Sequence, residues 1–268
     1  MSNAPEPPAL PPRPRLRAEV LIVLGLSLGQ SAVYAIITLI KRYLATTPVG
    51  GQSTQLNPSY SDVDWLNLIY QILRIGFSLM PVALALYLLS AQGTRALTQL
   101  GLTRHRADGT VRCWWVDVAW GAALAAGIGL PGLGLYAVGR ALGQSVRIDT
   151  SGLPDAWWAA LILLLSAAAA GVLEEVIVVG YLVTRLRQMR WGVAGAILAS
   201  AVLRGSYHLY QGWPMALGNV VMGVVFAGFF VRTGRVGPLI LAHWTIDAVS
   251  FIGPELLPAA WLDALQGV

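Results

Sequence analysis

The chain has 268 residues, of which 56% are hydrophobic and only 12% are charged. Soluble domains average about 25% charged residues, so this composition excludes an ordinary water-soluble domain. The formal net charge of +5 is typical of basic loops that orient a membrane protein, and no basic patch interleaved with aromatic residues indicates nucleic-acid binding. We therefore expect the lipid bilayer as a partner, and no nucleic acid. Cys113 is the single cysteine, which excludes an intrachain disulfide and a cysteine metal cluster.

Apolar runs of about the 20 residues that a transmembrane helix needs recur along the chain. A Pro-rich, polar N-terminal segment precedes them and is typical of a disordered tail. A Pro-interrupted C-terminal segment follows them and could lie at the interface or form a partial helix. The predicted fold class is all-α, a polytopic transmembrane helical bundle of about seven to eight spans. The predicted spans are 20–40, 66–90, 114–142, 156–187, 192–209, 214–231 and 236–253.

Basic residues fall mainly on one side of these spans, as in the segment that holds Arg185, Arg187 and Arg190. Cytoplasmic loops carry an excess of Lys and Arg. The distribution therefore predicts an integral membrane protein with a cytoplasmic N-terminus, in the plasma membrane of a prokaryote.

Ionisable side chains inside the spans mark a candidate site. A charge at the centre of a bilayer costs about 2.5–3.5 kcal/mol even on lenient insertion scales, so such groups indicate function when partners can be named. The ionisable residues at membrane depth are Arg74, Glu174, Glu175, Arg204, His208, His243 and Asp247.

Two pairs of these residues are spaced four apart and therefore share a helix face: His243 with Asp247, and Arg204 with His208. Carboxylates and imidazoles that converge in an apolar bundle suit the activation of water for amide hydrolysis. A glutamate can act as general base, and imidazoles can hold Zn²⁺ or donate to a developing oxyanion. Interhelical hydrogen bonding is the structural alternative for each histidine, and proton-coupled transport also uses buried Glu, His and Arg.

Glu174 and Glu175 are adjacent in an apolar helix and point about 100° apart around its axis. We expect one of them to face the reaction centre and the other to orient a neighbouring group. No basic residue follows them until Arg185, so a cation for the second carboxylate has to come from another helix.

Three segments carry a family resemblance. EEVIVVGYLVTRL (174–186), LRGSYHLYQG (203–212) and GNVVMGVVFAGFFVRTGRVGPLILAHWTID (218–247) resemble the motifs of the CAAX-prenyl-protease and bacteriocin-processing family (CPBP, or Abi). That family's pattern is E-E-x-x-x-R, then F-x-x-x-H, then H-x-x-x-N or D. The resemblance covers about residues 156–253.

The resemblance implies an intramembrane endopeptidase of the type II CAAX kind, acting on a membrane-associated peptide or protein. The family's catalytic residues fall on Glu174 as base, on His208 as its partner in water activation, and on His243 and Asp247 as oxyanion groups. Whether the family uses a metal stays open: Glu174, His208 and His243 could ligate Zn²⁺, and a metal-free glutamate mechanism fits the same residues.

The sequence departs from the family pattern at two positions. Val179 replaces the motif arginine that would pair with Glu175, and Arg204 replaces the motif phenylalanine. We expect the two changes to compensate, with Arg204 supplying the guanidinium that neutralises Glu175, so that both residues support the site. The alternative is an inactive scaffold or immunity protein that keeps the fold, and an ion-coupled transporter is a further competing class.

These predictions divide the chain into four regions: a disordered N-terminal tail (1–17), N-terminal transmembrane helices (18–150), a CPBP catalytic core (151–253) and a C-terminal tail or short interfacial helix (254–268).

Overall fold

The computed structural model describes residues 10–90, 95–103, 113–149 and 152–256. Helices make up most of this part of the chain, and its two three-residue strands pair in parallel. The elements are α1 (Arg13–Gly25), α2 (Leu28–Leu44), η1 (Val49–Gly51), β1 (Ser53–Gln55), α3 (Asp64–Ser78), α4 (Met80–Ser90), α5 (Ala96–Gln99), α6 (Trp114–Ala141), β2 (Arg147–Asp149), α7 (Ala159–Glu174), η2 (Glu175–Tyr181), α8 (Leu182–Gln188), α9 (Val193–Tyr207), η3 (Leu209–Gln211), α10 (Trp213–Thr233) and α11 (Gly237–Leu256).

The helical membrane fold agrees with the predicted class, but the predicted seven to eight spans are not confirmed. Among the described residues, four helical segments are long and apolar enough to cross a membrane: 64–90, 114–141, 159–188 and 213–233. A fifth is possible only if α1 and α2, which are bent by 54°, count as one span. Helix α9 has only 15 residues, about 22 Å at 1.5 Å per residue, and falls short of a bilayer.

The ends of the chain differ from the predicted regions. Helix α1 already begins at Arg13, so residues 13–17 of the predicted tail are helical. At the other end α11 continues to Leu256, and the rest of the predicted C-terminal region lies outside the described residues.

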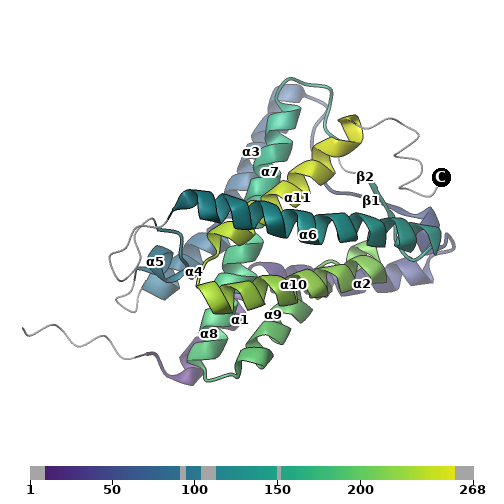
Figure 1. The fold of residues 1–268 in the computed structure, drawn as a ribbon. Helices are drawn as coiled ribbons and strands as arrows, with labels where there is room; N and C mark the ends of the chain where they lie inside the picture. The colour runs from purple at the N-terminus through teal and green to yellow at the C-terminus, as the bar shows by residue number, and fades with distance from the viewer. Residues whose placement is uncertain (1–9, 91–94, 104–112, 150–151, 257–268) are drawn as a thin grey trace, which may run out of the picture.

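The segment α7–η2–α8 is the axis around which the bundle packs. Figure 1 shows it running from top to bottom, crossed by α6 and α10, with α11 packed against both α6 and α7. Every residue of η2 is buried, because the apolar run Val176–Val179 contributes to the main hydrophobic core. The two glutamates therefore lie at the centre of the bundle.

Helix α9 packs closely against η2 and α10 through small residues. Ser200 of α9 donates a 2.8 Å hydrogen bond to the carbonyl of Val178 in η2. A methyl group built on Gly205 would lie 2.4 Å from Val220 of α10. One built on Gly223 of α10 would lie 2.7 Å from the Cα of Ala201. Small residues at these positions therefore let α9 pack closely against its neighbours.

The chain turns sharply between α9 and α10. Gly212 has φ of +107°, a conformation that only glycine adopts readily. A Cβ there would lie 2.3 Å from the carbonyl oxygen of Gln144. Gly212 therefore lets η3 close against the segment after α6 before α10 begins.

A buried ion pair joins α1 to the segment α7–η2–α8. Arg185 is fully buried, and its Nη2 lies 2.8 Å from Oε2 of Glu19 in α1. The same guanidinium donates to the carbonyl of Leu88 at 2.9 Å. Arg185 therefore binds α1 inside the bundle. The positive-inside pattern, in contrast, suggests that it is a charge on a loop.

Candidate functional site

The two glutamates mark a change in helix type. Glu174 is the last residue of α7, and Glu175 is the first residue of η2, which is a seven-residue π-helix. Such segments are rare and occur frequently at functional sites. The change places two adjacent carboxylates in the core, where Glu174 is 9% exposed and Glu175 is fully buried.

Glu175 is held by a cation from α9. Nη2 of Arg204 lies 2.5 Å from Oε1 of Glu175, and both side chains are fully buried. This ion pair confirms the pairing predicted from the replacement of the motif arginine by Val179. Nδ1 of His243 lies 2.7 Å from the same oxygen, so α7–η2, α9 and α11 meet at one carboxylate.

Glu174 faces the same group of side chains through its Oε2 atom. Tyr207 donates its hydroxyl to this oxygen at 2.6 Å, and Nη1 of Arg204 lies 3.4 Å away. Nε2 of His208 lies at 3.8 Å and Nε2 of His243 at 3.9 Å. The angular separation of the two glutamates does not keep them apart, because the guanidinium fork and the two imidazole nitrogens of His243 reach both.

The two histidines differ in their bonding. His243 is 4% exposed, and its Nε2 lies 3.4 Å from Oδ2 of Asp247. The predicted shared face of these two residues is therefore confirmed. By contrast, both ring nitrogens of His208 are buried without a hydrogen-bond partner among the described residues. Its ring lies beside Tyr207 and Tyr210, with centroids 4.8 Å and 6.5 Å away.

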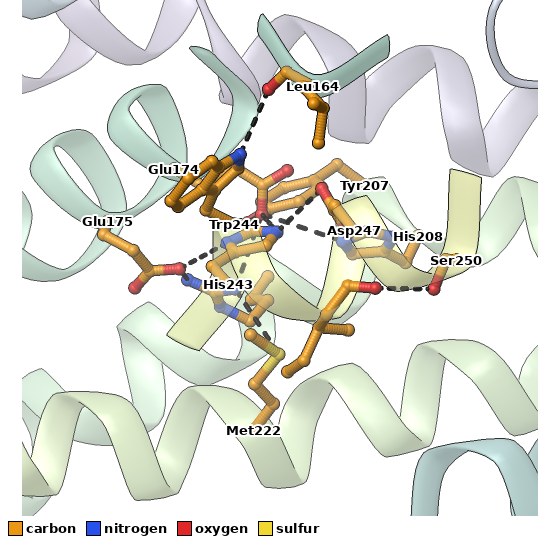
Figure 2. Close-up of polar contacts among 12 residues, drawn as sticks. Leu164, Glu174, Glu175, Tyr207, His208, Met222, His243, Trp244, Asp247 and Ser250 are labelled. Carbon is orange, nitrogen blue, oxygen red and sulfur yellow. Dashed lines mark hydrogen bonds and ion pairs between the residues drawn. The ribbon is translucent and has the colours of Figure 1, made fainter. Parts of the chain in front are cut away.

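The structure thus brings six predicted site residues together and leaves one out. Figure 2 shows Glu175 on one side of His243 and Asp247 on the other, with Tyr207 and His208 nearby. Arg74 is not part of this cluster, because its guanidinium lies 4.5 Å above the ring of Tyr60. The six residues are Glu174, Glu175, Arg204, His208, His243 and Asp247.

Sequence reasoning missed Tyr207. The only signal available was its position, three residues after Arg204 and directly before His208, which places its hydroxyl near the same helix face. It also missed the apolar support of Arg204, whose guanidinium lies 5.5 Å from the ring centroid of Phe226 and contacts the sulfur of Met222 at 3.8 Å.

A metal ion could be held by a different set of residues from the one predicted. Among the described residues, ligand atoms of Glu174, Glu175 and His243 all lie within 4.8 Å of one another, and His208 is not in this group. However, Arg204 contacts Oε2 of Glu174 and Oε1 of Glu175, so a dication between them would lie against a buried guanidinium. The arrangement of these side chains does not fit a resident metal ion, and no step below depends on one.

Fold and site together define an integral membrane protein with an ionisable Glu/His cluster inside a helical bundle. Residues 156–249 match the Rce1-like family, described as type II CAAX prenyl endopeptidase Rce1-like. This match confirms the predicted CPBP resemblance, and all six clustered residues lie within the matched segment. The comparisons with curated proteins and with solved structures give no match.

Proposed function

We propose that this protein is an intramembrane endopeptidase of the CPBP family that hydrolyses a peptide bond in a membrane-associated substrate. The observation that carries the proposal is the pairing of Glu174 with His208. Glu174 is a nearly buried carboxylate, and His208 is an imidazole 3.8 Å away that has no hydrogen-bond partner in the described part of the chain. Buried polar groups are normally paired, so an imidazole without a partner indicates a place for water or substrate.

In this proposal Glu174 takes a proton from a water molecule, and His208 orients that water. The oxygen attacks the scissile carbonyl, and a C–O bond forms as the carbonyl oxygen gains negative charge. When both of its ring nitrogens are protonated, His243 can donate to that oxyanion through Nε2. Nδ1 then donates to Glu175 at 2.7 Å, while the 3.4 Å separation of Nε2 from Asp247 is longer than a strong hydrogen bond. Breakage of the C–N bond then returns the proton to the departing amine.

Arg204 and Glu175 have a supporting role in this chemistry. The ion pair neutralises the second carboxylate, so that Glu174 does not lie beside an unpaired negative charge. Glu175 also holds His243 through Nδ1 at 2.7 Å, which fixes the direction of Nε2. The loss of the motif arginine at Val179 is therefore no argument for an inactive protein, since Arg204 supplies the guanidinium.

The substrate class to test first is a prenylated CAAX-type peptide, because that is the activity named in the description of the matched family. The probe is an internally quenched peptide with a prenylated cysteine three residues before its carboxyl terminus, in liposomes that contain the purified protein. We expect cleavage by the wild type and none by Glu174→Gln, and an unprenylated copy of the peptide tests whether the lipid is required. Equal cleavage by Glu174→Gln would overturn the proposal in favour of a scaffold. A transporter would instead show flux that depends on a pH gradient.

A further inference from the structure

The shortest contact to Glu174 comes from a residue to which neither the family motif nor the proposed mechanism assigns a role. Tyr207 is the last residue of α9 and is 4% exposed. Its hydroxyl donates to Oε2 of Glu174 at 2.6 Å. A hydrogen bond from a neutral donor to a carboxylate is short and about twice as strong as one between neutral groups.

The two oxygens of Glu174 have different surroundings. Oε2 is the atom that faces Tyr207, Arg204, His208 and His243. The side-chain hydrogen bonds that Glu174 accepts from the described residues end on Oε2, and none of them ends on Oε1. A base needs a free lone pair aimed at the water that it deprotonates, and Oε1 is the oxygen that offers one.

The hydroxyl of Tyr207 is the group that can prevent the two oxygens of Glu174 from exchanging places. The last torsion of a glutamate side chain has a broad, roughly two-fold energy profile, so an unrestrained carboxylate would rotate. Arg204 is a weak restraint on that rotation, because its Nη1 lies 3.4 Å away and its Nη2 is bound to Glu175 at 2.5 Å. The imidazole nitrogens are further away still.

We propose that Tyr207 is the positioning residue of the base. Its hydroxyl holds Oε2 of Glu174 in place and thereby keeps Oε1 directed at the attacking water. The inference rests on the proposed function, in which Glu174 is the base. Tyr207 acts through Glu174 and does not itself touch the substrate.

The test compares Tyr207→Phe with Tyr210→Phe, each of which removes one hydroxyl and keeps the ring beside His208. The hydroxyl of Tyr210 accepts a hydrogen bond from Gln211 at 2.8 Å, and it is not among the groups of the described residues that donate a hydrogen bond to Glu174. With the quenched prenylated peptide, we expect Tyr207→Phe to lower kcat by about 10- to 100-fold. KM should change by less than about twofold, because uniform binding is not affected. Tyr210→Phe should keep the wild-type kcat.

Three results would overturn the inference: an unchanged kcat for Tyr207→Phe, a rise in KM at constant kcat, or an equal fall in kcat for Tyr210→Phe. If Tyr207→Phe does not accumulate, Tyr207→His keeps a planar ring with an N–H donor, and Tyr207→Leu has no donor. The inference then requires a higher kcat from Tyr207→His, and equal values would contradict it.

Glu174→Gln, assayed in parallel, separates this inference from the proposed function. If Glu174→Gln is inactive while Tyr207→Phe equals the wild type, only the role of Tyr207 is wrong. If Glu174→Gln remains active, the proposed function and the inference that rests on it both fail.

Discussion

Arg204 and Glu175 form a fully buried ion pair, with Nη2 and Oε1 2.5 Å apart, in a chain that has Val179 where the family pattern has an arginine. The positive charge has moved from the helix that carries the glutamates to the helix that faces it. Arg204 also reaches Glu174, so one guanidinium serves both carboxylates. This relocation is the feature that distinguishes the site from the family pattern.

The relocation predicts how single and double variants behave. Arg204→Phe restores the family's residue but leaves Glu175 buried without a cation, which should cost about 3–5 kcal/mol in the free energy of unfolding. Val179→Arg in the same chain returns the family's arginine one turn from Glu175 and should recover part of that loss. Unfolding of the purified protein in detergent measures both variants. Wild-type stability for Arg204→Phe alone would refute the compensation, and so would a double variant no more stable than that single one.

The two histidines should respond differently to substitution. His208 makes no hydrogen bond with the described residues, so His208→Ala should keep the melting temperature while it lowers kcat by about 10²- to 10⁴-fold. His243 holds Glu175 at 2.7 Å, so His243→Ala should lower both quantities. Thermal unfolding and peptide cleavage, measured on the same preparations, give the comparison. A large stability loss for His208→Ala would assign that residue a structural role.

Removal of metal ions should leave the activity unchanged. The guanidinium of Arg204 already contacts one oxygen of each glutamate carboxylate, and two cations repel each other in a buried site. The check is peptide cleavage after dialysis against a strong chelator, with the metal content determined by mass spectrometry. Loss of activity on chelation that Zn²⁺ restores would show that Arg204 moves aside and that Glu174, Glu175 and His243 hold the metal.

The close approach of α9 to α10 should be needed for both stability and activity. A methyl group on Gly205 would lie 2.4 Å from Val220 and 2.9 Å from the carbonyl of Ala216. Gly205→Ala should therefore cost about 1–3 kcal/mol and lower cleavage, because it shifts the helix that carries Arg204 and His208. Gly195→Ala, in the same helix, is the matched control, since its methyl group meets Trp191 at an ordinary 3.6 Å. Equal behaviour of the two variants would contradict this account.

The sequence could predict the parts of the site that depend on helical spacing. His243 and Asp247 are four residues apart and meet in the structure. The missing motif arginine identified Arg204 as the partner of Glu175 because a buried carboxylate needs a cation. Tyr207 was not predictable in the same way, because a tyrosine in an apolar helix usually serves packing. The π-helical form of η2 also cannot be recognised from the hydrophobic pattern of the sequence.

The predicted count of seven to eight spans is not confirmed, for local reasons. The predicted first span is bent between Gly25 and Leu28, where a methyl group on Gly29 would lie 2.7 Å from the carbonyl oxygen of Leu24; such Gly/Ser positions permit sharp bends. Helix α9 ends at Tyr207 because the chain turns through Gly212. Hydropathy detects apolar runs but not these interruptions.

We propose that Glu174 is the base of a peptide hydrolysis. Mass spectrometry can test this role on membrane peptides from cells that hold equal amounts of the wild type or of Glu174→Gln, a variant of the same size without the carboxylate. We expect new peptide termini in the wild-type membranes and the matching uncleaved peptides with Glu174→Gln. Identical sets of termini from the two cell populations would contradict it.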